Sequence, residues 1–200
     1  SRGLGDVYKR QVNDAGEWEH LLSIYEKYPM EELIIHPRVQ KDFYNNTPDM
    51  EVFLYAVENS RHTLCYNGDI CSVEDYRTWR QQMEEKRECA FMQESGHQTD
   101  PEDTGSLVSH LMLGRGVLKN PGLIGEITGH APITKDQLHA FHDDVLKGYL
   151  DVMSGERNTL FRMKELWFYM APLFTQYEKY AKKIKKAEKL KLYEAVVDAL

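Results

Sequence analysis

Two glycine-containing turns carry residue types that suit phosphate binding. Asn-Gly-Asp-Ile at 67–70 and Gly-Arg-Gly at 114–116 each follow a short apolar run. Glycine lets the backbone come close to a ligand, and a helix is predicted after each turn, at 72–84 and 120–127, so its positive N-terminal end would face an anion. The two turns therefore predict the phosphate end of a cofactor site. In (β/α)8 barrels, the loops after the last two strands often bind phosphate.

The elements that position these turns follow an α/β pattern. Short apolar runs predict strands at 32–35, 63–66 and 111–113, and helical spacing of apolar residues predicts helices before the first two. Such alternation is typical of a parallel sheet with right-handed crossovers. The polar stretch at 86–106 contains two glycines and a proline, which predicts an inserted loop.

The character of the sequence changes after Pro132. Three amphipathic helices are predicted there, with Trp167 in the core of the second and Pro172 bending or ending it. We expect a partial barrel domain at 12–132 and a C-terminal helical domain at 133–200. Residues 1–11 are excluded from the fold, because 5–11 resemble the translation of a sequencing-library adapter and predict a non-native tail.

Composition narrows the possible class of protein. The chain has 200 residues, of which 42% are hydrophobic and 28% charged, as in a packed globular protein. A complete barrel typically needs ~250 residues, so we expect only part of one. The sequence shows neither a signal peptide nor an apolar run of the ~20 residues that span a membrane, so we expect a cytoplasmic protein with no membrane partner. The three cysteines lack metal-type spacing, so no metal site is predicted.

Charge is unevenly distributed. The formal net charge is −7, yet the segment 179–191 contains seven lysines and one acidic residue. A lysine run of this kind is either a solvated face or a contact surface for phosphates. Both interpretations stay open at this point.

With these motifs in view, the chain resembles the tRNA-dihydrouridine synthase family over residues 12 to 200. That family reduces a uracil ring in tRNA with FMN and NADPH, and it is built as a (β/α)8 TIM barrel followed by an α-helical bundle. The resemblance implies the C-terminal portion of that barrel, strands six to eight, plus the bundle. It is carried by the order and spacing of His36-Pro37-Arg38, Gln40, Phe43-Tyr44, Pro48-Asp49, Asn67-Gly68-Asp69-Ile70, Gly114-Arg115-Gly116 and Asn120-Pro121.

The resemblance also implies roles for single residues. His36 would contact the flavin ring, Arg38 would face the RNA, and Pro37 replaces the small residue usual between them. The flavin phosphate would be held by Asn67, Gly68, Asp69, Gly114 and Arg115. If the lysine run binds tRNA, we expect Lys182, Lys185 and Lys189 to contact its phosphates.

The family's catalytic cysteine belongs to the first half of the barrel. Cys65, Cys71 and Cys89 do not share its context, so no catalytic residue is assigned and the chain alone is expected to be inactive. His139 and His142 lie three apart on a predicted helix; without a third ligand we expect a surface role for both.

Two other functions remain open. The chain could be a non-catalytic RNA-binding module derived from this family, in which the helical domain is the functional part. It could also belong to another FMN-dependent barrel oxidoreductase that acts on a small molecule. The lysine-rich helical domain favours RNA over a small molecule, and neither the oligomeric state nor the choice between NADPH and NADH follows from the sequence.

Overall fold

The computed structural model describes residues 6–7, 16–39, 47–94, 108–175 and 177–199. The chain divides into two compact units. The first comprises residues 1–70 and 74–113, and the second comprises residues 71–73 and 114–200. The division falls earlier in the chain than the predicted change at 132–133. Each unit is described by itself.

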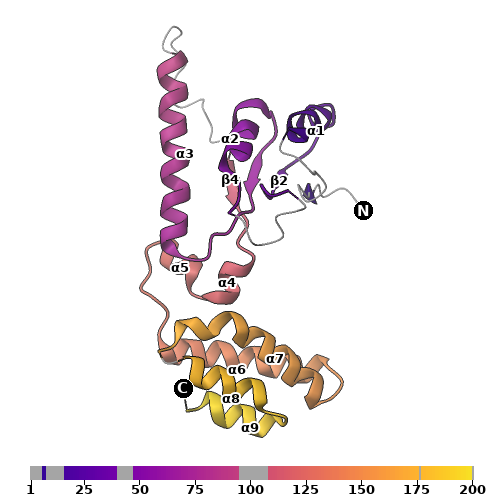
Figure 1. Ribbon diagram of the computed structural model, residues 1–200, viewed down its shortest axis with the longest axis vertical. Coiled ribbons are helices and arrows are strands. Elements are labelled where there is room, and N and C mark those ends of the chain that lie inside the picture. Colours follow the sequence, from indigo (N-terminus) through magenta and orange to yellow (C-terminus); the bar gives the residue numbers. More distant parts are fainter. Residues whose placement is uncertain (1–5, 8–15, 40–46, 95–107, 176, 200) are drawn as a thin grey trace. The chain divides into compact units, whose positions relative to one another are not determined.

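The first unit contains a parallel sheet of four short strands. These are β1 (Asp6–Val7), β2 (Leu33–Ile35), β3 (Leu64–Tyr66) and β4 (Val108–Leu111), and each pairs with its neighbours in chain order. The connections carry helices α1 (Glu17–Tyr25), α2 (Met50–Asn59) and α3 (Val73–Glu94) (Figure 1). Within the described residues, β1 and β4 are the two edges of the sheet. The unit is therefore α/β, and the sheet is open as far as it is described.

Apolar side chains of the strands and helices form the core of this unit. Leu33, Ile35 and Leu64 on the sheet are fully buried, as are Phe53 and Ala56 on α2. The side chain of Asp49 caps α2 by accepting hydrogen bonds from the backbone N–H groups of residues 51 and 52. This satisfies donors that a helix N-terminus otherwise leaves unpaired.

Two elements differ from their predicted bounds. Helix α3 continues to Glu94, into the segment predicted as an inserted loop, and residues 95–106 of that segment lie outside the described residues. Pairs four residues apart, such as Arg80 with Glu84, support the polar helix, and no glycine or proline interrupts it. Strand β4 lies at 108–111 rather than at 111–113. Two residues of the excluded segment 1–11 form β1, next to β2.

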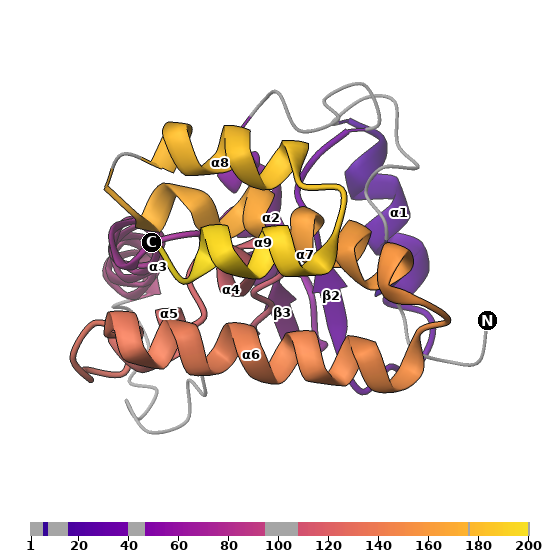
Figure 2. The ribbon, with the colours of Figure 1, turned by 90° about the horizontal axis from the view of Figure 1, so that it is seen from below.

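The second unit is helical throughout its described part. Figure 2 shows α6, α7, α8 and α9 as its longer helices. Thr134 and Gln137 form a reciprocal capping box at the start of α6, and Gly155 precedes α7 at a φ of 89°, which favours glycine. The helices are α4 (Arg115–Lys119), α5 (Leu123–Ile127), α6 (Lys135–Val152), α7 (Glu156–Met170), the 3-10 helix η3 (Ala171–Leu173), α8 (Tyr177–Lys186) and α9 (Leu190–Val197).

Proline and asparagine set the helix ends in this unit. Helix α7 ends at Met170, and Pro172 lies in the short 3-10 turn that follows, as predicted. The helix predicted at 120–127 is wrong at its start, because Asn120 ends α4 and its side chain accepts a hydrogen bond from Gly122 N–H. Helix α5 begins only at Leu123. No helix in the described part of the chain is both long and apolar enough to cross a membrane.

Candidate functional site

The carboxyl ends of β2 and β3 bring together two predicted motifs. These strands pair in parallel, with Ile35 opposite Tyr66. The chain continues from them into His36-Pro37-Arg38 and Asn67-Gly68-Asp69. A hydrogen bond joins His36 to Asn67, and an ion pair joins Arg38 to Asp69. Four predicted site residues thus form two contacts between segments 31 residues apart. In parallel α/β sheets, ligands bind outside the carboxyl ends of the strands.

The contact of His36 fixes the orientation of its ring. Its Nδ1 faces the carbonyl oxygen of Asn67, which can only accept, so Nδ1 carries the proton. In the neutral ring, the lone pair then lies on Nε2. The side chain is partly exposed at the end of β2. His36 is therefore a half-buried imidazole with a defined tautomer.

Arg38 is almost entirely buried. Its exposed fraction is 1%, and its Nη2 forms the ion pair with the carboxylate of Asp69, which is 31% exposed. The backbone carbonyl of Pro37 accepts a hydrogen bond from Asp49 N–H, which ties this segment to the start of α2. The resemblance assigns Arg38 to the RNA side, whereas in this structure its guanidinium contacts Asp69.

The ring of Tyr66 explains why residue 68 is a glycine. A Cβ at this position would lie 2.1 Å from the hydroxyl oxygen of Tyr66. Tyr66 is buried between Phe53, at a ring-centroid distance of 4.8 Å, and Trp79, at 5.6 Å. Burial, with the negative charge of Asp69, raises the pKa of Tyr66 to about 12, although Arg38 acts in the opposite direction. The predicted close approach of a phosphate at Gly68 is therefore not needed to explain this glycine.

A cavity of about 500 Å³ adjoins these residues. Its lining includes Arg38, Pro48, Tyr66, Asp69 and Trp79. The indole N–H of Trp79 is buried and has no hydrogen-bond partner among the described residues. The cavity lies within the first unit.

The remaining residues of the predicted site belong to the second unit. Gly114 precedes α4, with open space on the side where a Cβ would lie, and Arg115 is the first residue of that helix. Lys182 and Lys185 are exposed on α8. Lys189 is exposed too, but it precedes α9, because α8 ends at Lys186. Lys189 therefore does not share a helix with Lys182 and Lys185.

A buried polar network in the second unit was missed from the sequence. His142 is 3% exposed, so the predicted surface role for this residue is wrong. Its Nε2 lies 2.6 Å from the hydroxyl oxygen of Tyr193, which is itself 2.6 Å from Nε1 of Trp167. The helical spacing of Leu138, His142 and Leu146 places the histidine on the buried stripe of α6. That i, i+4, i+8 pattern is the signal that could have predicted it.

The donors of this network follow from its chemistry. The indole of Trp167 can only donate, so the oxygen of Tyr193 accepts from it. With a neutral imidazole, the hydroxyl of Tyr193 then donates a hydrogen bond to Nε2 of His142. Nδ1–H of His142 donates to the carboxylate of Asp143, 2.9 Å away. Burial raises the pKa of Tyr193 strongly, with a smaller opposing effect from its bond to Trp167. The network therefore pairs its buried polar groups in the core.

Cys65 lacks the properties of a catalytic thiol. Cys65 is buried, and burial together with the charge of Glu32 raises its pKa to about 11. A raised pKa keeps a thiol protonated and poorly nucleophilic. Cys71 is half-buried, and the side chain of Cys89 lies outside the described residues. Nor do the described residues contain a group of three side chains suited to a metal ion.

Comparison with known proteins adds no relative from which a function could be inferred. The chain matches no known protein family, and it matches no curated protein.

Proposed function

We propose that this chain is part of an FMN-dependent tRNA-dihydrouridine synthase, the C-terminal portion of its (β/α)8 barrel followed by its helical bundle. The observation that carries the proposal is the pair of contacts at the strand ends, His36 with Asn67 and Arg38 with Asp69. Both motifs belong to the resemblance, and they meet where parallel α/β folds bind ligands. The open parallel sheet with helical connections supports the same interpretation.

The residues of the first unit suit the flavin ring better than the flavin phosphate. A half-buried imidazole of fixed tautomer suits a hydrogen bond to the flavin ring, and His36 provides one. The turn at 67–69 is a poorer phosphate site, because Asn67 N–H already donates to Ile35 and Asp69 is anionic. Of the residues that the resemblance assigns to the phosphate, this leaves Gly114 and Arg115 of the second unit as the candidates. Bound FMN would supply the hydride for the uracil, with NADPH as the electron donor.

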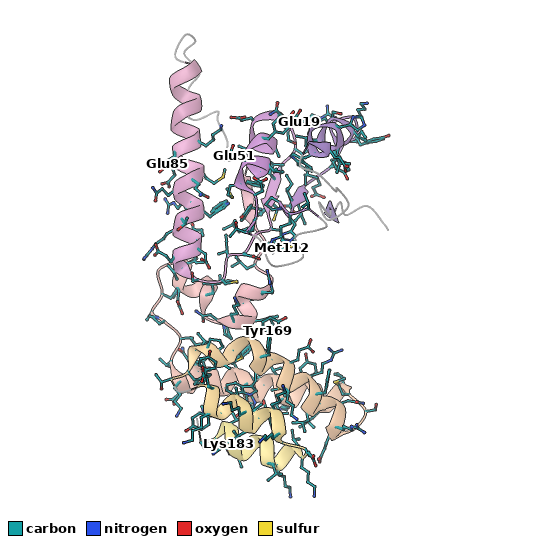
Figure 3. The ribbon with its side chains drawn as sticks, in the orientation of Figure 1. Glu19, Glu51, Glu85, Met112, Tyr169 and Lys183 are labelled. Carbon is teal, nitrogen blue, oxygen red and sulfur yellow. The ribbon has the colours of Figure 1, made fainter. Side chains whose placement is uncertain are left out.

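The lysines of the second unit support RNA as the partner. All seven lysines between 179 and 191 are exposed, and none forms an ion pair with a described acidic residue. Figure 3 shows Lys183 on α8. Reduction of a uracil ring requires the base to leave its stack, so the body of the tRNA must be held by its phosphates. Exposed lysines suit that contact.

The decisive experiment uses the protein translated from the complete gene, with the upstream half of the barrel. We expect it to bind FMN and to form dihydrouridine in unmodified tRNA when NADPH is added. The 200-residue chain alone should bind FMN weakly or not at all, because half of the ring pocket is missing. Stoichiometric FMN on the chain alone would contradict a partial barrel. A complete protein that binds tRNA without flavin would instead support the RNA-binding module, and a flavoprotein that leaves tRNA unchanged would support a small-molecule oxidoreductase.

The assignment of the phosphate has its own test. In the complete protein, Arg115→Ala removes a charge-assisted hydrogen bond worth roughly 1.5–3 kcal/mol, so the Kd for FMN should rise by about one to two orders of magnitude. Lys119→Ala, at the other end of α4, is the control and should change the Kd much less. Equal losses in the two variants would refute Arg115 as the phosphate ligand.

A salt series tests the lysines. Each lost phosphate contact lowers the slope of log K against log salt concentration, so Lys182→Ala, Lys185→Ala and Lys189→Ala together should flatten it for tRNA while FMN binding stays unchanged. Lys135→Ala with Lys147→Ala on α6 is the control, and its slope should match the wild type. An unchanged slope in the triple variant would mean that these lysines form a solvated face and do not contact the tRNA phosphates.

A further inference from the structure

A second surface of the helical unit has the chemistry of a nucleotide site. It is a groove of about 690 Å³ between the N-terminal half of α7 and the junction of α8 and α9. Leu160, Ala187 and Leu190 are buried and give it an apolar floor. Its volume lies within the range of small-molecule sites.

One aromatic side chain stands at this groove. Phe161 lines it and is 68% exposed, although it belongs to a 15-residue helix whose other face is buried. An aromatic ring beside an apolar floor can receive the face of an unpaired base, and every base offers such a face.

The rim of the groove carries cations. Arg157 and Lys189 are exposed, and within the described part of the chain neither forms an ion pair. Lys164 also lines the groove, but its Nζ donates to the carbonyl oxygen of Lys185 at 3.0 Å. The lining also contains the acidic residues Glu156 and Glu188. Its five charged side chains therefore carry a net charge of +1. The lysine run continues from this rim along α8, which extends the positive surface.

We propose that this groove binds an unpaired nucleotide of RNA, with its base stacked on Phe161 and a phosphate at Arg157 and Lys189. The apolar floor and exposed ring suit a base, and the two cations suit the backbone next to it. The inference rests on the proposed function for the identity of the RNA as tRNA. It shares Lys189 with the lysine run and adds contacts at Phe161 and Arg157. A protein ligand is the competing occupant.

The test measures binding of a labelled, unstructured RNA oligonucleotide to the 200-residue chain by fluorescence anisotropy. Phe161→Ala should weaken binding by ~5–150-fold, the range expected when a base loses its aromatic partner. Phe161→Trp should retain binding, because it keeps a stacking surface. Phe168→Ala is the matched control, since Phe168 lies on the same helix, is 80% exposed and is outside the groove lining.

The phosphate contact is tested in the same assay. Arg157→Ala should weaken binding and flatten its salt dependence, with a slope about 0.7 smaller for one lost contact to a single strand. Arg162→Ala on α7 is its control, because Arg162 pairs with Glu165 away from the groove. Circular dichroism of each variant checks that the helices remain folded.

The results separate this inference from the proposed function. Equal affinities for Phe161→Ala, Phe168→Ala and wild type would overturn the groove as a base site, as would an absence of RNA binding by the chain. Capture of a peptide by the groove with no effect of Phe161→Ala on RNA would assign it to a protein. Dihydrouridine formation by the complete protein tests the proposed function alone, so either can fail without the other.

Discussion

The strand ends of the first unit and the core of the second each organise a histidine in a different way. His142 has hydrogen bonds at both ring nitrogens, to Tyr193 and to Asp143, and is buried. His36 is bound at Nδ1 to a backbone carbonyl and remains partly exposed. The difference shows that a histidine in contact with distant residues is not by itself a sign of a site. What distinguishes His36 is its position at the carboxyl end of a parallel strand.

The same contrast holds for the two buried tyrosines. Tyr193 lies at the centre of the polar network and links α9 to α6 and α7. Tyr66 is packed between rings, but it also lines the cavity of about 500 Å³ near Arg38 and Asp69. The network of the second unit therefore holds helices together, whereas the contacts of the first unit also shape a surface. Substitutions in the two regions should separate these roles.

The largest effect is expected at the buried ion pair. Asp69→Asn removes the carboxylate that pairs with the buried guanidinium of Arg38, which should lower the free energy of unfolding of the first unit by about 3–5 kcal/mol. Arg80→Ala breaks an exposed pair on α3 and serves as the control, with an expected change below about 0.5 kcal/mol. Denaturant unfolding monitored by circular dichroism measures both. Similar small losses in the two variants would show that the Arg38–Asp69 contact does not support the fold.

The next effect concerns the network of the second unit. Tyr193→Phe removes the acceptor of Trp167 and the donor to His142, leaving two buried groups unpaired at a cost of roughly 2–4 kcal/mol. Trp167 is the one tryptophan of the second unit, so its fluorescence follows that unit. Tyr180→Phe on α8 is the control, with an expected cost near zero, because Tyr180 is only partly buried and lies outside this network. RNA binding at low temperature should survive in Tyr193→Phe, as expected for a residue that supports the core alone.

The sequence predicted the parts of the fold that depend on local pattern. Apolar runs located β2 and β3, helical spacing placed Trp167 in the core, and Pro172 marked the end of α7. It could not predict that α3 would extend to Glu94, because a polar helix carries no apolar stripe. The stability of this helix comes from charge pairs and from an unbroken run of helix-forming residues. In composition, such a polar segment resembles a loop.

The candidate site was predictable in its members but not in its contacts. The sequence singled out His36, Arg38, Asn67 and Asp69, yet their pairing depends on the parallel register of β2 with β3. The need for glycine at position 68 could not be predicted either, because it depends on how the Tyr66 ring lies against the turn. Long-range packing decides both features, and short motifs do not contain it.

A smaller effect is expected at Gly68. Gly68→Ala places a methyl group where the ring of Tyr66 lies, so the ring or the turn must shift, at a cost of about 1–3 kcal/mol. In the double variant Gly68→Ala with Tyr66→Leu, most of this added cost should disappear, because the shorter side chain vacates the ring position. Denaturant unfolding of the four proteins in this cycle measures the coupling. Additive losses would mean that Tyr66 is not the reason for the glycine.

The smallest effect comes from alkaline pH. The pKa of Tyr66 is raised from 10.0 to about 12 by burial, so between these values the unfolded chain loses its proton first and stability falls as pH rises. At pH 11, this one residue should lower the free energy of unfolding of the first unit by about 1.4 kcal/mol relative to pH 7. Tyr193 is shifted in the same direction, so the second unit should lose stability too. Tyr66→Phe should abolish its share in the first unit alone, and Tyr193→Phe its share in the second alone. Unfolding at pH 7 and pH 11 in the wild type and both variants tests this, and an equal pH dependence in all three would contradict burial as the cause.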